Sequence, residues 1–223
     1  MDEQKLRSIL EEFMVKLAAL LGEYTTPPEG VTPEQPELPL GDRLDVDVLA
    51  ELVSHEGIVL EAYKDSKGIW TWGIGVTNAS GHKVLRYKDN PATLNKVLEI
   101  FEWLVRSKYL PAVEKAFTRP LTKAQLAAAL SFHYNTGAIS RASWVKSFNK
   151  GDYGKAEQEI MNWRTPAEIV ERRGKERDLF FHGKWSNDGT AVLYEKVNKP
   201  SYTPKWSSAK KVNIKQELSK WVS

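Results

Sequence analysis

The 223-residue sequence contains no cysteine. A disulfide scaffold, a thiol nucleophile and a thiolate metal site are therefore excluded, so stability must come from packing. The sequence also lacks any uninterrupted run of about 18 apolar residues, the length that a membrane-spanning helix needs. The chain does not open with a basic segment followed by an apolar stretch, so we expect no secretory signal and synthesis in the cytoplasm.

Histidine is scarce, and the four present, His55, His82, His133 and His182, show no metal-ligand spacing. Gly73 and Gly75 stand in a Gly-x-Gly run that lacks the third glycine and the following helix of a dinucleotide site. Neither a Walker loop nor a Gly-x-Ser-x-Gly elbow occurs in the sequence. We therefore expect no metal and no other cofactor.

Charge is distributed unevenly along the chain. Residues 1–50 hold 11 acidic and 4 basic side chains, whereas the whole chain has a formal net charge of +3. The remainder is therefore strongly cationic, which suits an anionic polymer: a nucleic acid, a membrane surface or a bacterial cell wall. A merely solubilising surface is the alternative.

The first 41 residues predict two appendages. Apolar residues at Leu6, Leu10, Phe13, Leu17 and Leu20 mark one face of an amphipathic helix within residues 1–24. Such a stripe must pack on the chain's own body, on a second copy, or on a partner protein. Residues 25–41 contain five prolines and predict an extended linker. A domain boundary near Gly41 follows.

Residues 42–183 predict a globular α+β domain. A helix from Val48 to about His55, capped by Asp45 or Asp47, precedes a hairpin whose strands are Leu60 to Lys64 and Ile69 to Ile74. The later part predicts helices near 92–108, 111–117, 122–135, 141–149, 152–163 and 166–181. A small sheet with many helices is an α+β layout.

Residues 184–223 form a basic, aromatic C-terminal extension with eight lysines and three acidic residues. Its pattern is irregular until a helix near 213–222. The extension either packs its aromatic side chains on the domain or presents them as a wall- or membrane-binding patch.

Two carboxylates in the hairpin region suggest acid–base chemistry. Glu56 is expected at the C-terminal end of the first helix, where the helix dipole opposes a negative charge and favours the protonated acid. Asp65 is expected at the hairpin turn, where it is wetter and ionised. Thr71, on the returning strand, points its hydroxyl back toward a water beside Asp65. An acid paired with a second carboxylate is what glycoside hydrolysis requires.

The spacing Glu-x8-Asp-x5-Thr, followed by Gly-x-Gly, resembles the catalytic signature of the phage-type lysozyme (endolysin) family, the muramidases of glycoside hydrolase family 24. The segments Leu121 to Ile139, Asn149 to Tyr153 and Asn162 to Phe180 also resemble that family. The likeness covers about residues 45–183. It implies a two-lobed fold with a small hairpin-bearing lobe, a larger helical lobe and a sugar-binding cleft between them.

The resemblance also implies residue roles. Glu56 matches the general acid, Asp65 the water-directing carboxylate and Thr71 its hydroxyl partner. Arg172 matches an arginine near the catalytic glutamate, where its charge would oppose the effect of the helix end. His133 and Asn135 match positions that line the cleft. His133 departs from the glutamine that is usual there. It fits equally well as a residue at a helix end whose hydrogen bonds are made to its neighbours.

Other positions are expected to be structural. Trp70 and Trp72 alternate with Thr71 and are expected to pack rather than to stack on sugar. Val76 stands where many relatives have histidine, which removes a structural ion pair but no catalytic group. Gly73 and Gly75 permit close backbone approach or a bend at a strand end.

The implied reaction is hydrolysis of the β-1,4 bond between N-acetylmuramic acid and N-acetylglucosamine, with inversion. A lytic transglycosylase and an inactive wall-binding module with a muramidase fold are the alternatives. Bacterial peptidoglycan is the expected partner, and no nucleic-acid partner is expected. Residues 1–22 are expected to contact a second copy, a virion protein or another partner. The enzyme would be made in the host cytoplasm and act on periplasmic peptidoglycan, or be carried in the virion.

Overall fold

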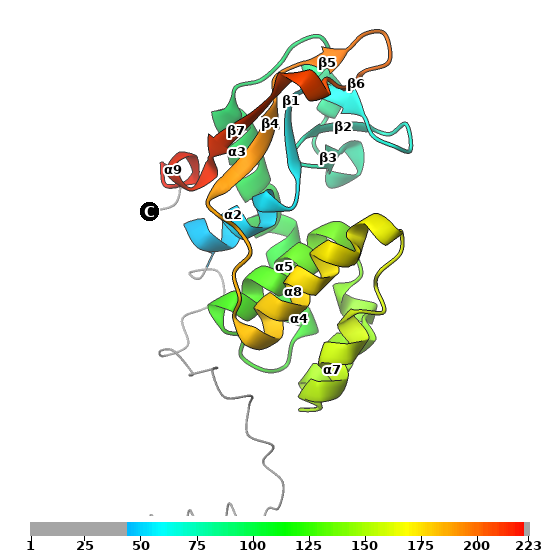
Figure 1. Ribbon diagram of the computed structural model, residues 1–223, viewed down its shortest axis with the longest axis vertical. Coiled ribbons are helices and arrows are strands. Elements are labelled where there is room, and N and C mark those ends of the chain that lie inside the picture. The colour runs from blue at the N-terminus through cyan, green and yellow to red at the C-terminus, as the bar shows by residue number, and fades with distance from the viewer. Residues whose placement is uncertain (1–43, 221–223) are drawn as a thin grey trace, which may run out of the picture. The chain divides into compact units, whose positions relative to one another are not determined.

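The computed structural model describes residues 44–220. The expected N-terminal helix, the linker and the boundary at Gly41 lie outside the described residues, as does the end of the helix expected near 213–222. Figure 1 shows a small sheet and, beside it, a larger group of helices. The expected α+β fold class is thus confirmed. None of the helices that the structure describes is long and apolar enough to cross a membrane.

Helix α2, Val46–Ser54, leads the chain to the sheet. Asp45 is its N-cap, because its Oδ1 accepts hydrogen bonds from the backbone N–H groups of Asp47 at 3.0 Å and Val48 at 3.1 Å. This satisfies donors that the first helical turn leaves without partners. Of the two caps that the sequence allowed, the structure selects Asp45.

A hairpin follows the helix, as predicted. Strand β1, Gly57–Lys64, pairs antiparallel with β2, Trp70–Gly73, and Tyr63 lies opposite Thr71. A two-residue strand that the sequence did not predict, β3 at Val76–Thr77, extends the sheet beyond β2. Val76 is buried there and lies opposite Trp72.

Both tryptophans of the hairpin pack against other aromatic side chains, Trp72 fully buried and Trp70 half-buried. The fully buried Trp72 stacks on Tyr87 at 3.7 Å between ring centroids and donates its indole N–H to the Leu60 carbonyl at 2.9 Å. Trp70 meets Tyr202 edge-to-face at 5.0 Å. The expected packing role of these residues is confirmed.

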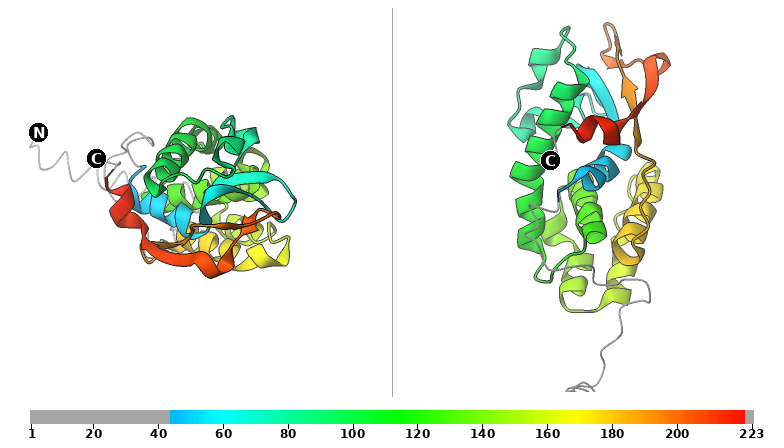
Figure 2. Two further views of the ribbon diagram at one scale, coloured as in Figure 1. Left: turned by 90° about the horizontal axis from the view of Figure 1, so that it is seen from above. Right: turned by 90° about the vertical axis from the view of Figure 1, so that its left-hand side faces the viewer.

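One continuous helix connects the sheet to the helical lobe, where the sequence predicted two helices with a break. Helix α3, Leu94–Leu104, passes through a π-helical turn, Val105–Tyr109, into α4, Leu110–Ala116 (Figure 2, right). Pro111 lacks a backbone N–H and its ring would collide with a carbonyl of the preceding turn in a regular helix. The wider π turn before it accommodates the proline without ending the helix.

The helical lobe surrounds a buried central helix, α5. Every side chain from Leu126 to Phe132 is buried, and Thr122 with Gln125 forms a capping box at the helix start. A helix that is apolar all round belongs in an interior. Helix α5 spans Lys123–Thr136. The other helices of this lobe are α6 (Ser143–Asn149), α7 (Tyr153–Ile160) and α8 (Val170–His182). Short 3-10 turns lie at Asn78–Ser80, Val84–Tyr87, Ile139–Arg141, Ala167–Ile169 and Trp206–Ser208.

The C-terminal extension is part of the sheet, so the prediction of an irregular segment was wrong. Strand β4, Thr190–Tyr194, runs parallel to β1, and β7, Ala209–Asn213, pairs antiparallel with β4. The sheet order is β3-β2-β1-β4-β7. Helix α9, Ile214–Leu218, buries both its first and last side chains. A two-stranded ribbon joins β4 to β7, formed by β5, Val197–Asn198, and β6, Thr203–Pro204.

A buried carboxylate on α2 holds the start of this extension. Glu51 is fully buried, and its two carboxylate oxygens accept hydrogen bonds from the backbone and side chains of Ser186 and Asn187, the shortest at 2.6 Å. His55 Nε2 lies 3.3 Å from the same carboxylate. Burial alone would raise the pKa of Glu51, but His55, Ser186 and Asn187 outweigh it and lower the pKa from 4.5 to about 2.

We predict that Glu51→Gln destabilises the fold in a pH-dependent way. Because the folded-state pKa is depressed, the stabilisation is present above the unfolded pKa of 4.5 and is lost as the pH falls toward about 2. At pH 7 the variant should lose about 3 kcal/mol in free energy of unfolding, measured by urea denaturation. Glu99→Gln, at an exposed ion pair with Lys96 on α3, is the control and should change it by less than about 1 kcal/mol. A loss in Glu51→Gln that stays constant from pH 3 to pH 7 would contradict this assignment.

Candidate active site

Glu56 lies at the junction of α2 and β1. Its backbone N–H donates to the Val53 carbonyl at 3.0 Å, and β1 begins at the next residue. The side chain is 23% exposed, and Oε1 accepts a hydrogen bond of 2.5 Å from Arg172 Nη1. The helix end that opposes a negative charge is therefore countered by a cation in direct contact.

The helical lobe fixes Arg172. Its Nε donates to Glu176 Oε1 at 3.0 Å, and its Nη2 donates to the Ser131 carbonyl at 3.1 Å. Glu176 is fully buried and also accepts from the Ser131 hydroxyl at 2.6 Å and from Arg173. A buried ion pair is favourable only when further hydrogen bonds complete it, as they do here. The guanidinium is thus presented to Glu56 in one orientation.

The hairpin turn fixes Asp65. Its Oδ1 accepts from the backbone N–H groups of Lys67 at 2.8 Å and Ile69 at 2.9 Å, and its own N–H donates to the Ile69 carbonyl at 3.0 Å. Oδ2 accepts no hydrogen bond from residues 44–220. One carboxylate oxygen therefore orients the side chain while the other can accept a proton.

Thr71 belongs to β2, lies opposite Tyr63 of β1 and is 3% exposed. Its hydroxyl donates to the Ile69 carbonyl at 3.1 Å. That bond uses the hydroxyl proton and leaves the oxygen as an acceptor. A water bound to Thr71 would therefore be held through its own proton.

Tyr63 of β1 lies in the electrostatic field of both carboxylates. Burial raises the pKa of its phenol, and the negative charges of Glu56 and Asp65 raise it further. Thr71 lies directly opposite Tyr63 on the neighbouring strand, and Asp65 belongs to the turn of the same hairpin.

The family model for phage lysozymes matches residues 53–176. This chain belongs to the phage lysozyme family.

Two relatives and one solved structure illustrate the similarity. An endolysin of Acyrthosiphon pisum secondary endosymbiont phage 1 is 30% identical over 138 residues, which are 56% of this chain and 89% of that protein. A SAR-endolysin of Escherichia phage N15 is 37% identical over 112 residues, 48% of this chain and 61% of that protein. The structure of an endolysin from Escherichia coli O157:H7 phage FAHEc1 has a TM-score of 0.55 at 24% identity and covers 69% of this chain and 98% of that one. It supports the phage lysozyme fold.

The other two expected cleft residues have structural partners. His133, on α5, packs edge-to-face on Tyr109 at 5.2 Å, and burial lowers its pKa. Asn135 Oδ1 accepts a hydrogen bond of 2.7 Å from Arg173 Nη2. Asn135 therefore supports the arginine that neighbours Arg172 in sequence. A substrate contact for either residue stays a prediction.

Gly75 brings the backbone close to the acid. Its φ of +66° lies in the left-handed region, and a Cβ at this position would lie 3.6 Å from the Tyr134 ring and 3.9 Å from Glu56 Oε2. Tyr134 in turn donates its hydroxyl to the Ile74 carbonyl. A Cβ would fit at these distances, so glycine is required here by the backbone conformation.

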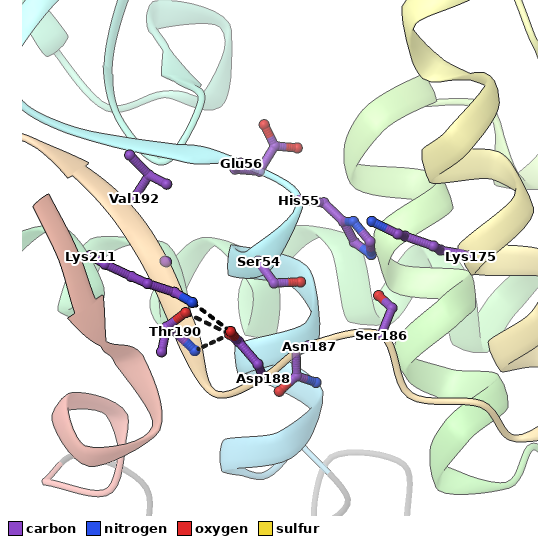
Figure 3. A pocket seen from close by; sticks show the side chains of 11 residues that line it. Ser54, His55, Glu56, Lys175, Ser186, Asn187, Asp188, Thr190, Val192 and Lys211 are labelled. Atoms are coloured by element: carbon purple, nitrogen blue, oxygen red, sulfur yellow. Dashed lines mark hydrogen bonds and ion pairs between the residues drawn. The ribbon is translucent and has the colours of Figure 1, made fainter. Parts of the chain in front are cut away.

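A pocket of about 280 Å³ adjoins Glu56 (Figure 3). Its walls come from the end of α2, from Lys175 of α8, from residues 186–192 and from Lys211 of β7. Most of this lining belongs to the C-terminal extension, beyond the region that the family model matches. The sequence did not predict it.

Sequence reasoning also missed Tyr63 and Glu176, although Glu176 has a local signal. Tyr63 lies two residues before Asp65, near the end of the predicted strand. Glu176 follows Arg172 by four residues on α8, the spacing of a helical ion pair. That helical spacing would have placed Glu176 beside Arg172.

We predict strong energetic coupling between Arg172 and Glu56. A double-mutant cycle with Arg172→Met and Glu56→Gln, followed by urea denaturation at pH 7, should give a coupling energy of about 1–3 kcal/mol, because either single change leaves a partly buried group without its partner. The more exposed Arg106–Glu102 pair, at 2.6 Å, serves as the reference and should give less than about 1 kcal/mol. Equal coupling in the two pairs would show that Arg172 does not hold Glu56.

Proposed function

We propose that this chain is a muramidase that hydrolyses the β-1,4 bond between N-acetylmuramic acid and N-acetylglucosamine in bacterial peptidoglycan. Membership of the phage lysozyme family supports peptidoglycan as the substrate. The observation that carries the catalytic assignment is that the two carboxylates are held differently, Glu56 by the Arg172 guanidinium and Asp65 by the backbone of its turn. Such a pair is suited to acid and base roles on opposite sides of one bond.

In the proposed reaction, Glu56 donates its proton to the glycosidic oxygen as the bond breaks. Asp65 takes a proton from a water through Oδ2, and Thr71 helps to orient that water. The water oxygen bonds to the anomeric carbon, so one sugar gains a reducing end and the other a hydroxyl. Arg172 is a positioning residue in this scheme, because it acts through Glu56. Attack by a separate water favours inversion.

A lytic transglycosylase is the second enzymatic candidate. Such an enzyme needs one acid and lets the sugar's own hydroxyl close on the anomeric carbon, so it has no use for a positioned water. The turn that orients Asp65 and the acceptor oxygen of Thr71 support hydrolysis instead. The same features argue against an inactive wall-binding module, which would need neither.

We predict that Glu56→Gln abolishes clearing of chloroform-treated Gram-negative cells in a turbidity assay. A general acid supplies about 10² to 10⁴ in rate, so the loss should be at least that large. Circular dichroism should show the fold retained, since Arg172 keeps its bonds to Glu176 and Ser131. The exposed Glu114 of α4 provides a control, and Glu114→Gln should clear cells at the wild-type rate. Clearing by Glu56→Gln at that same rate would remove Glu56 from the proposed mechanism.

We predict that Asp65→Asn also abolishes hydrolysis. The amide oxygen can still accept from Lys67 and Ile69, but the neutral amide cannot take a proton from water. Mass spectrometry of fragments made by the wild-type enzyme should show reducing ends rather than anhydro ends. Full activity in Asp65→Asn together with anhydro ends would establish the transglycosylase.

A further inference from the structure

We propose that the pocket beside Glu56 binds the stem peptide of the peptidoglycan strand being cut. The inference rests on the proposed function and adds a substrate contact to it. The pocket combines two lysines with one aspartate, and Glu56 lies at its edge (Figure 3).

The position of the pocket ties it to the cleavage point. Its lining includes Ser54, His55 and Glu56, the last residues before β1. The opposite wall is β4, where Val192 lies beside Gly57 in the parallel pairing. The pocket therefore adjoins the residue that is proposed to donate the proton.

The charges of the pocket come from opposite sides. Lys175 projects from α8 on one side, and Lys211 of β7 lies on the other (Figure 3). Lys211 Nζ lies 2.7 Å from Asp188 Oδ2, and the hydrogen bond from Lys211, with those from Thr190, lowers the pKa of Asp188. Lys175 Nζ lies 2.7 Å from Glu171, whose side chain is largely exposed. Both lysine side chains therefore remain exposed to solvent despite their ion pairs.

This charge pattern favours a zwitterion over the alternatives. A polyanion would meet the carboxylate of Asp188 in the pocket, whereas an uncharged sugar would gain no ionic contact with either ammonium group. A stem peptide carries free carboxylates and, at its diamino acid, an ammonium group. The two lysines fit its carboxylates and Asp188 fits its ammonium.

The volume limits how much of the peptide enters. Ligand sites for drug-sized molecules have volumes of about 300–1,000 Å³, so the pocket of about 280 Å³ is at the small end. It accommodates one or two amino-acid residues rather than a further disaccharide. We therefore assign it to the stem peptide rather than to the glycan.

The test compares soluble, uncross-linked glycan strands with the same strands after an amidase has removed the stem peptides. The measured quantity is the ratio of kcat/KM on stem-bearing strands to kcat/KM on stem-free strands. Lys211→Met should lower this ratio about two- to fivefold, the size expected for an exposed ionic contact. The double variant Lys175→Met with Lys211→Met should lower it about tenfold.

Lys210→Met is the matched control. Lys210 neighbours Lys211 on β7, is 61% exposed against 65% for Lys211, and has its own ion pair with Glu195 at 2.8 Å. It lies opposite the buried Leu193, whereas Lys211 lies opposite Val192 of the pocket, so the two side chains leave opposite faces of the strand. The wild-type ratio in Lys210→Met supports the proposal. A ratio that is unchanged in Lys211→Met, or that falls equally in both variants, overturns it.

A binding experiment separates the pocket from the reaction. The Glu56→Gln protein is titrated with the free tetrapeptide L-Ala-D-Glu-meso-diaminopimelate-D-Ala and followed by NMR chemical shifts. Saturable shifts at residues 186–192 that become weaker when Lys211→Met is added support the pocket. They support it even if the wild-type chain cuts neither kind of strand, because failure to cut would refute only the proposed function. Absence of saturable shifts at millimolar peptide, with both strands cut by the wild-type chain, would refute the pocket and leave the proposed function standing.

Discussion

Moving a carboxylate out of water is costly unless a cation and hydrogen bonds replace the lost solvent. Arg172 meets that requirement for Glu56 and for Glu176 at the same time, with its guanidinium between the first residues of the sheet and the interior of the helical lobe. The contact joins the two lobes at the residue that is proposed to donate a proton. Since Glu176 and Ser131 fix the far side of Arg172, the orientation of Glu56 depends on the packing of α5 against α8.

The same junction is held from the other side by the C-terminal extension. Glu51 binds Ser186 and Asn187, and β4 then pairs with β1 from Gly57 onward, directly after Glu56. A Cβ on Gly57 would lie 3.2 Å from the Tyr194 ring, so the side chain of Tyr194 on β4 packs over Gly57 of β1. Glu56 is therefore fixed by a cation from α8 and by a strand that lies outside the residues matched by the family model. The extension is built into the part of the sheet that carries the acid.

The sequence predicted local features well and distant pairings poorly. The cap at Asp45, the hairpin and the helices of the larger lobe follow from turn residues and apolar periodicity, which act over a few positions. The strand at 190–194 was missed because apolar Ala191, Val192 and Leu193 are consecutive and give no clean alternation, although the middle one is exposed. Its partner β1 is more than a hundred residues away, and no local pattern encodes a parallel pairing across that distance.

The proposed catalytic residues were selected by their spacing, whereas the groups that hold them were not predicted. Glu56, Asp65 and Thr71 lie within one short stretch of sequence, so a motif can specify them together. Arg172 was placed by resemblance, but Glu176 and Ser131 could be found only once α5 and α8 were known to pack. The pocket shows the same limit, because its walls come from α2, α8 and two strands of the extension.

Addition of β4 and β7 also moves the exposed edge of the sheet away from Glu56. Without them β1 would be an edge strand, with unpaired backbone groups beside the acid. The edge is instead β7, where Lys210 and Lys211 both extend into solvent. Lysine on an edge strand discourages pairing with another chain, so edge protection alone accounts for two lysines here. It does not account for which face each occupies. Of the two, only Lys211 lines the pocket, where it pairs with Asp188, and that asymmetry distinguishes the proposed binding residue from a purely protective one.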